Sequence, residues 1–172
     1  MEFFDVLGAR HSVRAYGSQQ IEPGKMQQLL EAINRAPSAG DLQAFEVYIV
    51  CDAVRKNALV QAAGIQEFLS QAPIDLIFCA HASPSAVLYE ERGTNLYCIQ
   101  DATIACTFAM LAATALGLST VWVGAFDEDA VRRAIGAPQE HRPVAILPIG
   151  YSAETPRNRS RRSLADLIHQ VN

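Results

Sequence analysis

One stretch, residues 99–116, constrains the fold of this chain more than any other. It is apolar at nearly every position apart from Gln100, Asp101 and the threonines, and Gly117 follows it as a helix stop. A helix that is apolar all round must be buried all round, in a large core or in a subunit interface. For a chain of 172 residues, we favour the interface. The longest apolar run, residues 102–116, is about 15 residues long with three threonines inside it, too short to span a bilayer.

Length and charge narrow the class of protein. With 172 residues, 18.7 kDa and half of the residues apolar, the chain predicts a single domain over residues 1–172. The net charge of -4 gives no reason to expect nucleic acid. The first residues are acidic and show no signal peptide, so we expect a cytoplasmic protein with no membrane partner.

Cysteine and histidine spacing gives no metal site. The four cysteines lie in apolar runs without a CxxC pair, which predicts buried, reduced thiols in a reducing cytosol; they are Cys51, Cys79, Cys98 and Cys106. The histidines are scattered and form no HExxH motif, so no metal is expected. The chain also contains no GxGxxG, P-loop or GxSxG motif.

Helical and strand patterns alternate along the chain. Helices are expected at residues 2–9, 23–36, 53–63, 65–72, 95–116 and 128–135, with a short one around Leu164, Leu167 and Ile168. Strands are expected at residues 42–51, 74–80, 118–126 and 143–151. The first strand is apolar throughout, which predicts a central position in the sheet. Residues 81–93 predict a mobile loop or partial helix over a site.

Two short segments suit an anionic ligand that carries a flat ring. In an extended segment Arg10, Ser12 and Arg14 share one face, which is good geometry for one anion, although an ordinary solvated turn gives the same sequence. Residues 37–43 are small and polar and follow a helix end, so they either approach a ring or simply connect a helix to a strand. Together they favour a flavin mononucleotide (FMN) site.

Two further segments fit the same ligand. Gly124 and Ala125 end a predicted strand, where a glycine marks either a bulge or a place where a flat ring lies against the backbone. The flavin N5 atom accepts a hydrogen bond from such a backbone N–H. Residues 156–162 are rich in arginine, which indicates an anion site or only a soluble surface.

Taken in order, these segments resemble the nitroreductase family of FMN-dependent oxidoreductases, in its short form. The matches are Arg10–Arg14 with RRSxR, Ala36–Phe45 with APSxxNxQPW, Gln100–Leu118 with the central helix and its GL turn, Trp122–Phe126 with W-x-G-x-F, and Gly150-Tyr151 with the C-terminal end. The resemblance implies an α+β, three-layer α/β/α fold with a mixed, mainly antiparallel sheet. It also implies a homodimer whose two FMN sites are each built from both chains.

The resemblance assigns roles residue by residue. Arg10 and Ser12 would bind the FMN phosphate, with Arg14 near N1 and the C2 carbonyl, where a cation stabilises the reduced ring. The other implied FMN-binding residues are His11, Pro37, Ser38, Ala39, Asp41, Gln43, Val123, Gly124, Ala125 and either Arg159 or Arg161. Pro37, Ser38 and Ala39 would come from the partner chain. No side chain is assigned as a catalytic acid or base.

Three positions depart from the family pattern. Asp41 replaces an asparagine and would lower the flavin potential if its carboxylate reaches the ring. His11 replaces an arginine and Ala44-Phe45 replaces Pro-Trp.

The implied reaction is ping-pong. Hydride passes from NADH or NADPH to flavin N5, and electrons then pass to a nitroaromatic, quinone or related small acceptor. The alternatives are a flavin-binding or sensing module, a flavin-consuming or dehalogenating enzyme, and a structural dimer without cofactor.

Overall fold

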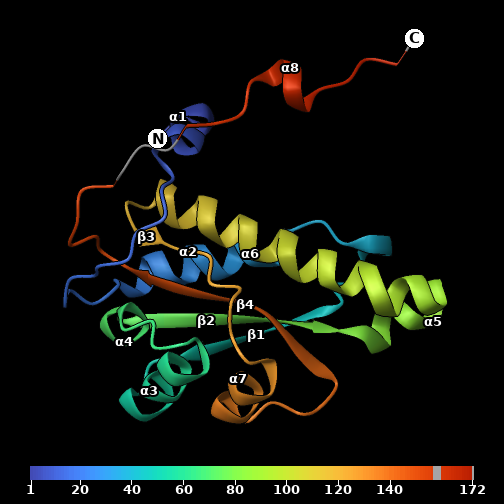
Figure 1. The fold of residues 1–172 in the computed structure, drawn as a ribbon, viewed down its shortest axis with the longest axis horizontal. Helices are drawn as coiled ribbons and strands as arrows, with labels where there is room; N and C mark the ends of the chain where they lie inside the picture. The colour runs from blue at the N-terminus through green and yellow to red at the C-terminus, as the bar shows by residue number, and fades with distance from the viewer. Residues whose placement is uncertain (157–159, 172) are drawn as a thin grey trace.

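A computed structural model describes residues 1–156 and 160–171 as three layers, with a sheet between two layers of helices (Figure 1). The helices are α1 Phe3–Ala9, α2 Pro23–Asn34, α3 Ala53–Ala62, α4 Phe68–Gln71, α5 Ala82–Arg92, α6 Cys98–Ala115, α7 Glu128–Ile135 and α8 Leu164–Leu167. A 3₁₀ turn, η1, spans Ala39–Asp41, and a π turn, η2, spans Gly93–Tyr97. The strands are β1 Phe45–Val50, β2 Ile74–His81, β3 Ser119–Thr120 and β4 His141–Gly150.

The sheet has the order β1-β2-β4-β3, and each neighbouring pair is antiparallel. A parallel bridge joins Ser12 to Thr120, so a segment near the N-terminus adds a short parallel element beside β3. The α+β class and the mixed, mainly antiparallel sheet are confirmed. A bulge between Phe78 and Cys79 shifts the register of β2 against β4.

The two faces of the sheet bury separate cores. On one face, Phe78 and Leu147 pack with α2 and α6; on the other, Ile77 and Ile146 pack with α3 and α7. All four side chains are fully buried, and burying each contributes about 1.5–3 kcal/mol. Apolar residues therefore run without alternation along β2 and β4, because both faces are covered.

Helix ends follow their predicted signals. Asp52 caps α3 by accepting from the Arg55 N–H at 2.9 Å, and Asp127 caps α7 by accepting from the Ala130 N–H at 2.7 Å. Gly136 ends α7 in the left-handed region, at φ 68°. These local signals were sufficient to place both helices.

The prediction of a central position for the first strand was wrong, since β1 lies at an edge of the sheet. Phe45 and Val47 pack against one core and Tyr48 against the other. Helices thus cover both faces of β1 although only one of its backbone edges is paired. Apolar residues on both faces of a strand show that helices cover both faces, but they do not show how many strands pair with it.

The predicted strand at residues 118–126 was also too long, because β3 contains only Ser119 and Thr120. The chain then leaves the sheet and touches it again at Val123, which bridges Ile146. The predicted loop or partial helix at residues 81–93 is α5, with a break at Glu90, where φ is 49° and ψ is -130°.

The helical stretch 82–115 is 34 residues long and apolar enough, by length and composition, to cross a membrane. Here it includes a core helix of the sandwich, since Ala105, Cys106 and Ala109 of α6 are fully buried against the sheet and α2. Core helices of soluble proteins commonly show this composition. Ile104 and Phe108 of α6 pack against the same core and stay half-buried, so one chain does not cover the helix completely.

Three of the four cysteines are buried, as predicted, and burial raises the pKa of the Cys79 thiol to about 12. The prediction was wrong for Cys51, which is exposed. It follows the last residue of the edge strand β1, where the chain turns toward α3.

Candidate functional site

The segment of residues 10–14 runs extended beside β3. The Val13 N–H donates to the Thr120 carbonyl at 3.0 Å, and the Val13 side chain is buried while those of Ser12 and Arg14 are exposed. This alternation is the predicted one, with the polar side chains opposite the buried valine. The guanidinium groups of Arg10 and Arg14 form no ion pair with any carboxylate in the described part of the chain. The segment thus presents two cations and a hydroxyl to solvent.

The beginning of the C-terminal tail pairs with this segment. The Ala153 N–H donates to the Ala15 carbonyl at 2.8 Å, and the Glu154 carboxylate accepts from the Arg14 N–H at 2.6 Å. Residues 153 and 154 therefore lie beside the backbone of residues 14 and 15. Arg161 is exposed, whereas Arg159 lies outside the described residues. A phosphate contact from either arginine stays a prediction.

Residues 123–125 form the next part of the candidate site. Val123 exchanges both backbone hydrogen bonds with Ile146 at 3.0 Å, so its N–H and C=O are used by the sheet. The N–H groups of Gly124 and Ala125 donate to no acceptor among residues 1–156 and 160–171. The backbone donors predicted to face a flavin are available at these two positions. The Gln66 amide lies beside them, 3.4 Å from the Ala125 carbonyl.

The loop of residues 37–43 is held by one buried carboxylate. Asp101 of α6 is 1% exposed and accepts from the Ala39 N–H at 2.9 Å and the Ala44 N–H at 3.2 Å. The Ser38 hydroxyl accepts from the Gln43 N–H at 2.9 Å, which closes the loop from within. Charge-assisted hydrogen bonds are stronger than neutral ones. Asp101 therefore sets the position of the loop against α6.

The middle of this loop has a left-handed backbone, with φ of 59° at Gly40 and 58° at Asp41. Aspartate tolerates this region better than most residues. The left-handed φ favours glycine at position 40, and a Cβ there would lie 2.7 Å from the Tyr89 hydroxyl of α5, which would have to shift. The Gln43 amide donates to the Asn34 carbonyl at 3.0 Å, which ties it to the end of α2.

The loop and the Arg10 segment lie far apart within one chain. The loop contacts Asp101 near the start of α6, whereas Ser12 contacts Thr120 beyond its end. A helix rises about 1.5 Å per residue, so residues 101 and 117 are about 24 Å apart. Figure 1 shows η1 and α1 at opposite ends of α6. The structure does not bring Pro37, Ser38, Ala39, Asp41 and Gln43 to the arginines of the same chain.

We predict that Asp41→Asn raises the reduction potential of bound flavin. A carboxylate near the ring disfavours the anionic reduced form, and asparagine removes that charge while keeping the left-handed backbone. A redox titration of both proteins measures the shift, with the exposed Asp129→Asn as the control. Equal potentials would mean that the Asp41 side chain does not reach the ring.

Sequence reasoning missed three side chains at these segments. Asp101 was visible as an isolated carboxylate in an apolar helix, and that pattern alone indicates a buried role. Gln66 and Tyr89 carry no such signal, because only the tertiary fold brings them to Ala125 and Gly40.

Comparisons with known proteins identify a family and relatives for this chain. A family model described as "Nitroreductase family" matches residues 7–151. The chain is 30% identical over 182 residues to a Bacillus subtilis protein named FMN reductase [NAD(P)H], covering 98% of this chain and 73% of that one. It is 29% identical to a Thermus thermophilus protein named NADH dehydrogenase, covering 84% of each. The structure of a Bacillus subtilis protein described as "hypothetical oxidoreductase YcnD" superposes with a TM-score of 0.91 at 28% identity, covering 100% of this chain and 75% of that one.

Proposed function

This chain belongs to the nitroreductase family, and on that basis we propose that it is an NAD(P)H-dependent FMN oxidoreductase that reduces a small organic acceptor. The acceptor is a nitroaromatic, a quinone or a related compound, and turnover is ping-pong. We place this activity in the cytoplasm. The observation that carries the proposal is made within the described residues: the guanidinium groups of Arg10 and Arg14 form no ion pair there, and the N–H groups of Gly124 and Ala125 have no acceptor there.

The residues present fit FMN. A phosphate needs a cation and a hydroxyl, which Arg10 and Ser12 offer on an extended, sheet-anchored segment that also carries Arg14. A ring nitrogen needs a backbone donor, and Gly124 and Ala125 each have one. When bound, FMN supplies the hydride-accepting and electron-donating chemistry.

The chain's own residues bind and orient. Arg14 would place positive charge where the reduced ring carries negative charge, and the Glu154 carboxylate holds the backbone from which its side chain extends. Gly124 has no side chain of its own, so its backbone can approach a flat ligand; the Trp122 indole nitrogen lies 3.0 Å from the position that a Cβ would take. Asp101 holds the loop of residues 37–43 in one conformation.

We predict that Arg14→Ala weakens FMN binding by about 1.5–3 kcal/mol, roughly 10- to 150-fold, because a charge-assisted contact is lost. The measurement is the quenching of FMN fluorescence as flavin-free protein is added. Arg133→Ala, an exposed arginine on α7, is the matched control. An unchanged FMN affinity in Arg14→Ala would remove this residue from the site.

We further propose a homodimer in which each FMN contacts both chains. Residues 37–43 and the Arg10 segment are too far apart in one chain to share a ligand, and a second copy brings them together. Apolar residues also project from the body without cover: Phe4 is 81% exposed and Val87 is 90% exposed. The tail of residues 160–171 extends away from the body in Figure 1 and is exposed along its length, yet carries Leu164 and Ile168.

If the protein is a dimer, we expect size-exclusion chromatography with light scattering to give a mass near twice 18.7 kDa. Because the apolar tail would lie on the partner, Leu164→Glu combined with Ile168→Glu is expected to shift the protein toward monomer. A matched pair of exposed polar positions, Gln61→Glu with Gln139→Glu, should leave the mass unchanged. A monomeric mass for the wild-type chain contradicts the dimer.

The proposed function is tested by an absorbance spectrum of FMN-loaded protein followed by anaerobic additions of NADH and NADPH. Flavin bands that bleach within seconds and return when a quinone or nitroaromatic is added support the oxidoreductase. Bands that persist contradict turnover and favour a binding or sensing module. If flavin is instead consumed when oxygen is admitted, the result favours a flavin-degrading relative. Failure to bind FMN contradicts the proposal.

A further inference from the structure

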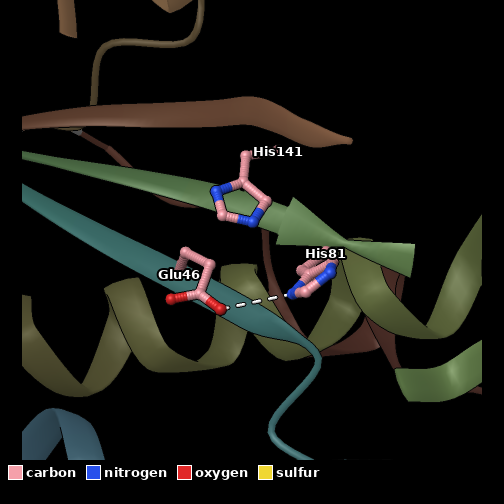
Figure 2. A group of neighbouring side chains, drawn as sticks. All are labelled: Glu46, His81 and His141. Atoms are coloured by element: carbon pink, nitrogen blue, oxygen red, sulfur yellow. Dashed lines mark hydrogen bonds and ion pairs between the residues drawn. The ribbon is translucent and has the colours of Figure 1, made fainter. Parts of the chain in front are cut away.

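Three metal-ligating side chains meet at one end of the sheet. They are Glu46 of β1, His81 at the end of β2 and His141 at the start of β4, and their ligand atoms all lie within 4.8 Å of one another. Figure 2 shows the three side chains converging from neighbouring strands. The sequence pattern gave no expectation of this group, because its members are separated by 35 and 60 residues.

The strand register explains why they meet. His81 lies directly opposite His141, and their ring centroids are 4.6 Å apart. This pairing depends on the bulge between Phe78 and Cys79, because an unshifted register would place Arg142 opposite His81. Bulges commonly redirect a side chain at a functional position. Here the bulge places His141, a possible metal ligand, opposite His81 in place of the cationic Arg142.

The separation of two of the donors suits a shared ion. The Glu46 Oε1 and His81 Nδ1 atoms are 3.2 Å apart. Zinc binds nitrogen and oxygen at about 2.0–2.2 Å in tetrahedral geometry, which separates two ligand atoms by about 3.3 Å. A cation can therefore replace the hydrogen bond between these atoms with little movement of either side chain.

The third donor is already oriented. The Tyr48 hydroxyl lies 2.6 Å from His141 Nδ1, which leaves Nε2 to face Glu46 and His81 (Figure 2). Metal-binding histidines almost always have their second ring nitrogen held by a hydrogen bond in this way. A tyrosine hydroxyl can accept a hydrogen bond, so Tyr48 is placed to hold the proton of His141 on Nδ1.

The local charge favours a cation. Glu46 and Glu140 both contribute negative charge near Tyr48. The nearby Arg142 guanidinium is engaged by both oxygens of Glu128 at 2.9 Å, so much of its positive charge is offset. The Glu46 and His81 side chains are 46% and 24% exposed, which leaves an entry path from solvent.

We propose that Glu46, His81 and His141 bind one divalent transition-metal ion of the Zn²⁺ type, with water completing the coordination. Two imidazoles and one carboxylate suit zinc and its neighbours in the first row better than Mg²⁺ or Ca²⁺, which prefer all-oxygen ligands. The ion joins β1, β2 and β4 at the end where β1 begins, and so stabilises the bulged end of the sheet.

The experiment is isothermal titration of ZnCl₂, and separately MgCl₂, into chelator-treated, FMN-loaded protein. We expect one Zn²⁺ per chain, no comparable Mg²⁺ binding, and a higher melting temperature with Zn²⁺. In His81→Ala combined with His141→Ala, Zn²⁺ affinity should fall at least about 100-fold, and in Tyr48→Phe about 10-fold. Glu46→Gln, a nearly isosteric change at a half-exposed position, should also weaken binding.

His169→Ala is the matched control, because His169 is exposed in the tail. It should bind Zn²⁺ as the wild type does. Three results would overturn the proposal: no Zn²⁺ uptake by the wild type, unchanged affinity in Glu46→Gln and the double histidine variant, or equal binding of Mg²⁺. The readout is heat and melting temperature, so the result is independent of whether the flavin turns over.

Discussion

Asp101→Ala is expected to lower the free energy of unfolding by about 3 kcal/mol and to release most of the bound FMN. The reason is that two backbone N–H groups, those of Ala39 and Ala44, lose their only described acceptor. Ala44 is fully buried, so water cannot replace the carboxylate at that N–H. The effect on FMN follows because the loop of residues 37–43 would lose its attachment to α6.

Urea denaturation followed by circular dichroism measures the stability, and the flavin-to-protein absorbance ratio measures occupancy. Thr107→Ala is the control, since Thr107 is exposed on the same helix and bonds only to the Thr103 carbonyl one turn earlier. It should change stability by less than about 0.5 kcal/mol. A loss below about 1 kcal/mol in Asp101→Ala would show that the carboxylate does not hold the loop.

Asp75→Asn is expected to stabilise the protein, and the gain should grow with pH. Asp75 is fully buried in β2, and neither of its carboxylate oxygens has a hydrogen-bond partner in the described residues. Burial raises its pKa from 3.8 to about 8, with the Lys56 charge opposing the shift only in part. The Lys56 ammonium instead donates to the Ala72 and Pro73 carbonyls.

The direction of the pH effect on stability follows from the number of protons that the folded and unfolded states bind. Between pH 3.8 and about 8 the folded state keeps the Asp75 proton while the unfolded state has lost it. Stability from this group therefore falls as pH rises through that window, by about 1.4 kcal/mol per pH unit. Asparagine carries no such proton, so the difference between variant and wild type should widen from pH 5 to pH 8.

Melting temperatures of both proteins across that pH range measure the difference. Asp5→Asn, at an exposed position on α1, provides the control and should show no widening gap. A gap that is constant with pH would mean that Asp75 is ionised in the folded protein and that Lys56 neutralises it.

Local signals predicted much of the fold, and tertiary context decided the rest. Caps at Asp52 and Asp127 placed α3 and α7, since these signals act through adjacent residues. The edge position of β1 and the early end of β3 were missed because they depend on which strands pair. Pairing is set by contacts across the whole chain, which hydrophobic pattern alone does not report.

The candidate site divides in the same way. The Arg10 segment and the glycine at position 124 carry distinctive residue types in short runs, so the sequence alone was enough to propose them. The roles of Asp101 and Gln66, and the meeting of Glu46 with two histidines, rest on strand register and helix packing. No spacing rule within the sequence reaches these groups.

Because α6 separates the Arg10 segment from the loop of residues 37–43, the proposed dimer has a consequence that can be seen in genetic complementation. If each FMN needs the arginine segment of one chain and the loop of the other, two differently defective chains can complement. Mixed expression of Arg14→Ala and Asp101→Ala chains would form heterodimers with one site carrying both lesions and one carrying neither. A cell that carries both defective alleles would thus regain activity that neither allele provides alone.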